Sequence, residues 1–151
     1  MTHPSRLNVE AKRRIDEILS RPTLARLATA SLGTLQPHVV PLWFYWDGEC
    51  LWMSGFRSTR KFRELRLNPR CAVVVDGGGP PPEGSPPTWG VLLEGEGELI
   101  DSPVEFVVEQ SLLIYTRYLG EEGVKDPEPR SWIYDAENTL IRLEPENVYV
   151  W

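Results

Sequence analysis

Alternating hydrophobic and polar positions predict that much of this chain forms short β-strands joined by tight turns. Asp47-Gly48 lies between two apolar runs, which is a strong signal for a two-residue hairpin. The runs that we interpret as strands cover residues 24–31, 38–46, 50–54, 71–76 and 91–100, and a last strand or strand pair covers 139–151.

Two of these runs carry more specific information. In segment 91–100 the glutamates alternate with leucine and glycine, which predicts one solvated face on a bent, barrel-like strand. Segment 38–46 is apolar on both faces, so we expect it to be buried on both, under a partner subunit, a flat ligand or both. Pro41 in this segment donates no ladder hydrogen bond, which indicates a bulge or a sheet edge.

Helical spacing is found in three places. Asn8 can cap a first helix, whose apolar face would carry Ala11, Ile15, Ile18 and Leu19. A second helix is expected from about Arg60 to Leu67, with Ser58 or Thr59 as its N-cap. A third is expected after the capping box Ser102–Glu105, with its end at Gly120.

The remaining segments are expected to be loops, namely the Gly- and Pro-rich stretch 77–89 and the polar stretch 121–131. Short hairpin-joined strands with few, scattered helices do not fit repeated strand–helix–strand units. The order of elements therefore predicts a mainly β (α+β) antiparallel barrel with a few helices outside it, in one domain over residues 1–151.

Composition narrows the possible functions. The net charge is −6, yet the first 75 residues carry 12 basic and 6 acidic side chains, so a local anion site fits better than nucleic-acid binding. The chain has no membrane-length apolar run and no signal-peptide pattern, so a cytoplasmic protein is the default expectation. Cys50 and Cys71 are expected to be reduced, and neither they nor His3 and His38 have metal-ligand spacing.

The basic segment Arg57-Ser58-Thr59-Arg60-Lys61 carries the most specific chemical signal. It opens a predicted helix, where free backbone N–H groups and the helix dipole favour an anion. Hydroxyl and cationic side chains add donors that suit a terminal phosphate monoester. The alternative is a capped helix with a solvated basic face, since Arg63 and Arg66 continue the run.

Aromatic residues are concentrated in "PLWFYW" and "LWMS". Most of these rings are expected in the core or at a dimer face, while a planar ligand along the second and third strands is the functional alternative. Its phosphate would then reach the helix start through Ser54–Phe56. No set of catalytic side chains is found, and His38 has the position of an ordinary strand residue.

One long segment, "RLATASLGTLQPHVVPLWFYWDGECLWMSGFRSTRKFRELRLNPRCAVVVD", resembles the flavin-binding core of the pyridoxamine 5′-phosphate oxidase-like family. The resemblance implies a six-stranded antiparallel split β-barrel with three peripheral helices here, and a homodimer with FMN at the subunit interface. Main-chain groups of Val40, Pro41, Leu42 and Trp43 would then line the isoalloxazine. Met53 and Ser54 would follow the ribityl chain, and the phosphate would be held by Arg57, Ser58, Thr59, Arg60 and Lys61.

The resemblance also has departures. Gly90 stands where the true oxidase has a glutamine near the flavin, and the oxidase's C-terminal substrate-binding Trp and Arg have no clear counterpart, so pyridoxamine-phosphate oxidation is not expected. We expect an FMN-dependent oxidoreductase that transfers hydride through flavin N5 to or from an unknown small substrate. Trp89 and the 77–88 loop would cover the substrate side.

Three alternatives stay open at the sequence level. An F420-dependent reductase could use the same fold, and a flavin- or haem-binding carrier or sensor would bind without turnover. A domain that binds a partner's acidic surface through its basic helix would need no cofactor at all. No metal, nucleic-acid or membrane partner is expected.

Overall fold

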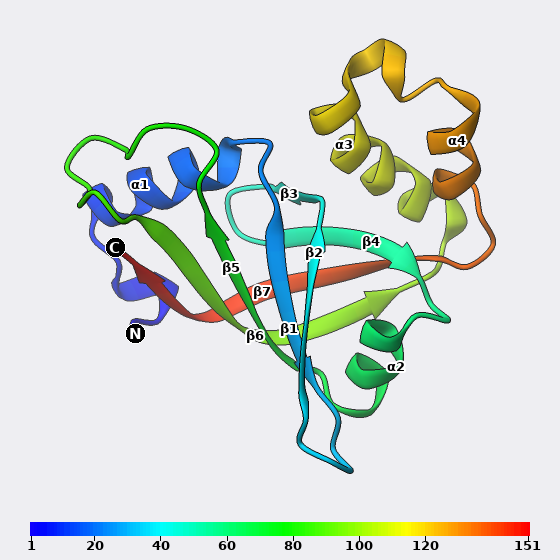
Figure 1. Cartoon of the computed structure of the whole chain (residues 1–151), viewed down its shortest axis with the longest axis horizontal. Helices are drawn as coiled ribbons and strands as arrows, with labels where there is room; N and C mark the ends of the chain where they lie inside the picture. The colour runs from blue at the N-terminus through cyan, green and yellow to red at the C-terminus, as the bar shows by residue number, and fades with distance from the viewer.

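The computed structural model describes residues 1–151 and shows one antiparallel sheet curled into a split barrel (Figure 1). Seven strands lie in the order β2-β1-β5-β6-β7-β4-β3. Their bounds are β1 Ala25–Ala30, β2 Pro37–Leu42, β3 Phe44–Trp46, β4 Leu51–Phe56, β5 Arg70–Asp76, β6 Gly90–Ile100 and β7 Asn138–Val150. The predicted mainly β split-barrel fold is therefore confirmed.

The strand count differs from the expected six because the segment 38–46 does not form one strand. β2 pairs with β1 as far as Leu42, and β3 pairs with β4 from Phe44 onwards. Trp43 is the single residue between them, so the chain passes there from one edge of the sheet to the other. The two edges meet at this residue, which is where the barrel is split.

The expectation that this segment is buried on both faces is wrong for β2. The strand alternates between exposed and half-buried positions, and the Val39 side chain is 58% exposed. β2 is an edge strand, one of the two possibilities that Pro41 indicated. Its exposed side chains show that one of its faces has no covering element within the chain.

The barrel interior holds the main hydrophobic core. The helix α1 (Val9–Ser20) covers one end of the barrel and buries Ile15, Ile18 and Leu19 among side chains of the strands (Figure 1). The predicted cap is confirmed, because the Asn8 side chain accepts a hydrogen bond from the backbone N–H of Ala11 at 2.8 Å.

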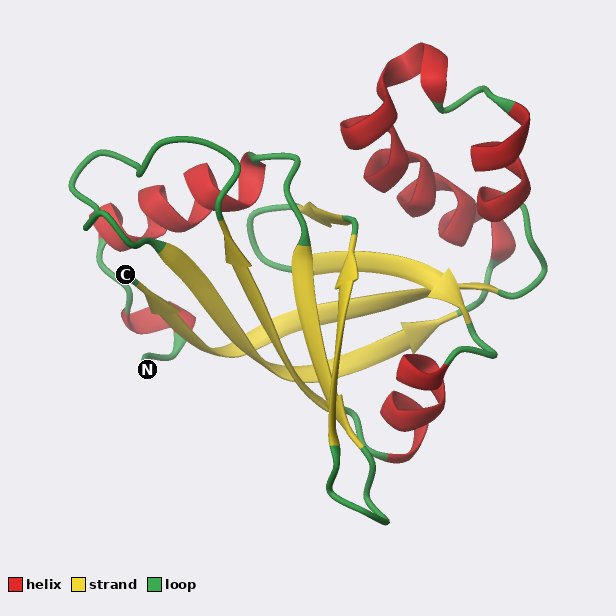
Figure 2. Cartoon of the chain, in the orientation of Figure 1, coloured by secondary structure: helices red, strands yellow, loops and turns green.

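The other helices lie outside the barrel, as Figure 2 shows. They are α2 (Arg60–Leu67), α3 (Val104–Gly123) and α4 (Pro127–Ile133), and a short 3-10 turn covers Pro4–Arg6. A second apolar cluster packs α3 on β4 and β7 through Trp52, Val107, Ile114 and Leu140. No helix combines the length and the apolar character that crossing a membrane requires.

Three helix predictions need correction. The capping box at Ser102–Glu105 does not form, because the N-cap position falls on Pro103, whose ring has no acceptor for the free N–H groups. Gly120 has a φ of 74° and kinks α3, but helical turns continue to Gly123. The segment 121–131 is not a loop throughout, since α4 begins at Pro127, a residue that suits a first helical turn.

The alternation predicted for β6 is confirmed. Glu96 and Glu98 are exposed while Leu93, Gly95 and Gly97 are buried, and a bulge interrupts the pairing with β7 between Glu94 and Gly95. A Cβ atom at Gly95 would lie 3.0 Å from the carbonyl oxygen of Glu144, so glycine allows β7 to come this close.

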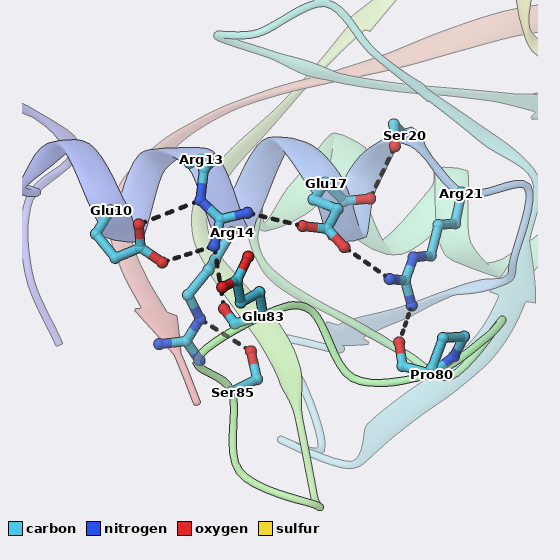
Figure 3. A network of polar contacts seen from close by, with 9 residues as sticks. All are labelled: Glu10, Arg13, Arg14, Glu17, Ser20, Arg21, Pro80, Glu83 and Ser85. Atoms are coloured by element: carbon cyan, nitrogen blue, oxygen red, sulfur yellow. Dashed lines mark hydrogen bonds and ion pairs between the residues drawn. The ribbon is translucent and has the colours of Figure 1, made fainter.

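The segment 77–89 is irregular, as expected, and arginines of α1 and its C-cap hold it against that helix (Figure 3). Arg13 donates to the carbonyl oxygen of Glu83 at 3.0 Å, and Arg21 donates to that of Pro80 at 2.7 Å. Arg14 donates to the Ser85 hydroxyl at 3.0 Å. These contacts fix the loop over α1 (Figure 1).

Candidate functional site

A hollow of about 330 Å³ lies where the barrel is split. Its walls come from the residue before β1, from β2 and the residue after it, from β4, and from the two outer helices α3 and α4. None of its lining residues carries a charge. The lining residues are Leu24, Pro41, Leu42, Trp43, Ser54, Tyr115 and Trp132. Four residues that the sequence assigned to a flavin ring and its chain, Pro41, Leu42, Trp43 and Ser54, are therefore brought together here.

Aromatic rings form one wall of this hollow. Trp43 and Tyr115 meet edge to face with centroids 5.3 Å apart, and Tyr115 contacts Trp132 at 6.0 Å. On its other side Trp43 stacks on Tyr118 at 4.7 Å. Aromatic pairs in these arrangements are favourable beyond the area they bury.

Tyr118 fixes this wall to the barrel through its hydroxyl group. The hydroxyl donates to the carbonyl oxygen of Thr23 at 2.6 Å and accepts from the backbone N–H of Phe44 at 3.2 Å. Burial raises the pKa values of both Tyr115 and Tyr118, so both hydroxyls stay protonated at neutral pH. The wall therefore carries no charge.

Two residues assigned to the ligand from sequence do not line the hollow with their side chains. Met53 is fully buried in the barrel core, and Val40 packs against that core from β2. Met53 could contact a ligand only through main-chain atoms. Val40 is half-buried, and main-chain contact is the mode the resemblance implied for it.

The basic segment begins directly after β4, at Arg57, three residues beyond Ser54. α2 begins at Arg60, as predicted, and Thr59 is its N-cap residue, but no side chain caps the helix. The first helical hydrogen bond is donated by the N–H of Arg63 to the carbonyl of Thr59, so the N–H groups of Arg60, Lys61 and Phe62 have no partner. An uncapped helix start of this kind favours an anion.

The hydroxyls of this segment are engaged within the chain. Thr59 donates to the carbonyl oxygen of Phe56 at 2.8 Å, and Ser58 donates to the Glu137 carboxylate. Ser58 would have to leave Glu137 before it could donate to a phosphate. Arg57 is exposed, and its side chain makes no hydrogen bond within the chain.

Lys61 has the most unusual environment of the cations. Its side chain is half-buried, its ammonium contacts only the Thr59 hydroxyl at 3.2 Å and the Phe62 ring at 5.4 Å, and it has no carboxylate partner. Desolvation lowers its pKa. A Cβ atom at Gly55 would lie 3.4 Å from Lys61 Cε, so the lysine extends back along β4 towards Ser54.

The other arginines of α2 have different partners. Arg60 donates through Nε to Glu64 at 2.8 Å, and Arg63 donates to the Ser58 carbonyl oxygen at 2.9 Å. Arg63 thus holds the backbone at Ser58, between β4 and α2, whereas Arg60 is paired with the buried acid Glu64.

Several residues of the site were missed from sequence. Tyr115 lies in the third predicted helix, to which no role in the site was assigned from sequence, and Trp132 lies between the predicted loop 121–131 and the last predicted strand. Pro127 and Pro129 lie in the first turn of α4, and prolines there are the sequence feature from which this helix could have been predicted. Trp89 does not line the hollow, because it is buried in the core under the Arg21 guanidinium at 4.7 Å.

The structure also explains why residue 90 is a glycine. A Cβ atom there would lie 2.6 Å from the Trp151 ring and 3.1 Å from the carbonyl oxygen of Val75. The C-terminal tryptophan covers this position, so no side chain at residue 90 could reach a ligand without displacing Trp151.

The fold has relatives among solved structures. A conserved hypothetical protein from Mycobacterium tuberculosis is 19% identical with a TM-score of 0.74, covering 100% of this chain and 89% of its own. A structure described as an F420 reductase is 25% identical with a TM-score of 0.66, covering 89% and 94%. An FAD-binding protein from Mesorhizobium loti is 23% identical with a TM-score of 0.56, covering 89% and 87%.

Sequence comparison gives the family directly. Among curated protein sequences none matches this chain. The sequence profile of the family described as Pyridoxamine 5′-phosphate oxidase, in contrast, matches residues 11–151, which is nearly the whole chain and includes both the hollow and the start of α2. The chain belongs to the pyridoxamine 5′-phosphate oxidase family.

Proposed function

We propose that this protein is an FMN-dependent oxidoreductase that acts as a homodimer on a small substrate. The observation that carries the proposal is the state of Lys61 at the uncapped start of α2. A half-buried ammonium without a carboxylate is unfavourable unless an anion neutralises it. The free N–H groups of Arg60, Lys61 and Phe62 supply further donors at the same place.

The hollow supports the placement of the flavin ring. Its neutral, largely apolar lining suits a planar heteroaromatic ring, and Ser54 lies in that lining one residue before Gly55. β4 then leads past Gly55, where Lys61 lies, to the start of α2. A ligand with a ring at one end and a phosphate at the other matches this arrangement.

The chain's own contribution would be binding and orientation. A bound flavin supplies hydride acceptance and donation at N5, so the protein need not provide an acid or a base. Main-chain groups of residues 40–43 would hydrogen-bond the ring edge, and the Trp43 and Tyr115 rings would exclude water from the hollow. Arg60 and Lys61 would hold the phosphate.

The exposed face of β2 supports a homodimer. Pro37, Val39 and Pro41 share the exposed positions of this strand, next to the residues that line the hollow. A second copy placed over this strand would bury these apolar side chains and close the open side of the hollow.

The likeness to the F420 reductase favours a second candidate, a deazaflavin-dependent reductase on the same fold. F420 carries its phosphate as an internal diester, whereas FMN ends in a monoester that can accept more hydrogen bonds from a helix start. The uncapped start of α2 therefore favours FMN. Separate titrations with the two cofactors decide between them.

The experiment that tests the proposal is a titration with FMN of the double variant Arg60→Ala/Lys61→Ala. We expect its affinity for FMN to fall at least about 100-fold, since two charge-assisted contacts are lost, while its dimeric mass and circular dichroism stay unchanged. Lys12→Ala, which removes an exposed lysine of α1, is the matched control. Unchanged FMN affinity in the double variant would refute the phosphate site.

Turnover distinguishes an enzyme from a carrier. An oxidoreductase should show steady NAD(P)H-driven reduction of the bound flavin coupled to oxidation by a second substrate. A carrier or sensor would bind FMN with the same affinity and the same dependence on Lys61, without steady turnover.

A further inference from the structure

Glu64 is a buried acid that links α2 to the barrel. Its residue is 8% exposed, and its two carboxylate oxygens have different partners. One accepts from Arg60 Nε at 2.8 Å, and the other accepts from the Thr29 hydroxyl on β1. A buried carboxylate is unfavourable unless it is paired and hydrogen-bonded, and these two contacts meet that requirement.

The contact with Thr29 fixes the carboxylate in space. Thr29 is itself buried, and it lies near the end of the β1 pairing with β2, opposite His38. The Thr29 hydrogen bond lowers the pKa of Glu64, with a further contribution from Arg60, so the acid stays ionised at neutral pH. Glu64 is therefore a fixed negative charge at the interface between α2 and β1.

The contact with Arg60 uses only one edge of the guanidinium. Arg60 Nε donates to Glu64, while the two terminal nitrogens make no hydrogen bond within the chain. The edge formed by those two nitrogens remains available and can bind a phosphate with two parallel hydrogen bonds. A guanidinium held by Nε loses less side-chain freedom when it binds an anion than one that moves freely in solvent.

We propose that Glu64 is a positioning residue for phosphate recognition, which holds Arg60 in a phosphate-binding orientation and ties that orientation to β1 through Thr29. The inference rests on the proposed function, since it assigns a role within the proposed phosphate site. Glu64 does not touch the ligand and acts only through Arg60. The alternative role is simple neutralisation, in which Glu64 weakens anion binding by reducing the local positive charge.

The test measures the ratio of riboflavin to FMN dissociation constants, because riboflavin lacks only the phosphate. Glu64→Leu removes the acceptor for Arg60, whereas Glu64→Gln keeps an acceptor oxygen and a group that can pair with Thr29. We expect Glu64→Leu to lower this ratio about 10-fold relative to the wild type. The ratio for Glu64→Gln should stay within about 3-fold of the wild-type value. Glu109→Leu, at an exposed position of α3, is the matched control.

A double-mutant cycle with Arg60→Ala shows whether Glu64 acts through Arg60. In that background Glu64→Leu should not change the ratio further. If Glu64→Leu does not fold, Thr29→Val replaces it in the same measurement, with an expected decrease of about 3-fold, because Glu64 then loses its anchor on β1.

The outcomes separate this inference from the proposed function. If the wild-type protein binds FMN no more tightly than riboflavin, the phosphate site itself is wrong. If the wild type prefers FMN and Glu64→Leu keeps or raises that preference, only the positioning role is wrong. A decrease that persists in the Arg60→Ala background also contradicts it.

Discussion

The ring of Tyr118 lies flat on that of Trp43, with centroids 4.7 Å apart and planes 6° from parallel. Trp43 is the residue at which the chain passes from one edge of the sheet to the other, and Tyr118 belongs to the outer helix α3. The pair therefore fixes α3 to the split of the barrel and sets one wall of the hollow. The position of this wall depends on a contact between elements far apart in the sequence.

Removing the Tyr118 hydroxyl should destabilise the protein. In Tyr118→Phe the ring still stacks on Trp43, but the carbonyl of Thr23 and the N–H of Phe44 lose their partner. We expect the free energy of unfolding to fall by about 1–3 kcal/mol, measured by urea denaturation. Tyr134→Phe, at an exposed ring, should change it by less than about 0.5 kcal/mol. Equal effects of the two substitutions would contradict this role.

A side chain at residue 90 should disturb the C-terminus. In Gly90→Ala the new Cβ would lie 2.6 Å from the Trp151 ring, so the ring must move or the strand must shift. We expect about 1–3 kcal/mol of destabilisation and a change in tryptophan fluorescence. Gly33→Ala is the control, since its Cβ would have no neighbour closer than 3.9 Å.

The relation between Gly90 and Trp151 can be tested by a second substitution. Trp151→Ala removes the ring that the new Cβ would meet, so the effect of Gly90→Ala should be smaller in that background. Fully additive effects would show that the clash is with the backbone of Val75 alone.

FMN binding should depend on pH through Lys61. Desolvation lowers the pKa of Lys61 from its ordinary value of 10.5, so the free protein releases this proton at a lower pH than an exposed lysine would. We expect FMN affinity to fall as the pH rises through the lowered pKa, because the phosphate needs the ammonium. Lys61→Arg should bind FMN without this fall, since an arginine stays charged. A wild-type affinity that is constant up to pH 10.5 would contradict this prediction.

The lowered pKa of Lys61 also makes the stability of the ligand-free protein depend on pH. Between the lowered pKa and 10.5 the unfolded chain binds a proton at Lys61 that the folded chain has released. The contribution of Lys61 to stability therefore rises with pH across this window and is lost as the pH falls through the folded-state pKa. Urea denaturation of the wild type and of Lys61→Met over this pH range measures the contribution.

The cysteines should be unreactive in the folded protein. Both are unpaired and buried, and desolvation raises the pKa of Cys71 to about 12. We expect a disulfide reagent at pH 8 to modify Cys71 only as fast as the protein unfolds, and the protein to lose stability as the pH rises from 9.0 towards 12, where the unfolded thiol ionises first. Immediate modification of the native protein would refute the burial of this thiol.

Local patterns were enough to predict most of the barrel. Alternation located β6 with its glutamates outward, Asn8 located the start of α1, and Arg60–Leu67 was predicted with the bounds of α2. The break at Trp43 could not be predicted, because the apolar run in residues 38–46 is continuous and the break depends on which neighbour each half pairs with. The exposure of β2 has the same cause, since position in the sheet is a non-local property.

Part of the candidate site was also predictable. The basic segment was identified from its own local chemistry, whereas four residues of the hollow were assigned through the family resemblance. Tyr115 and Trp132 could not be identified in this way. They belong to helices that come about 60 residues or more after the other lining residues in the chain, and they reach the hollow only through packing. Glu64 reads in sequence as one more charge on a basic helix, and only its burial against Thr29 distinguishes it.

The most direct test of the central claim is a pair of titrations of the purified wild-type protein, one with FMN and one with riboflavin, followed by flavin absorbance and fluorescence. We expect saturable binding of FMN, at one flavin per chain, with an affinity at least about 100-fold higher than that of riboflavin. Equal affinity for the two flavins, or no binding of either, would contradict the claim that the start of α2 holds the phosphate of a flavin whose ring lies in the hollow at the split of the barrel.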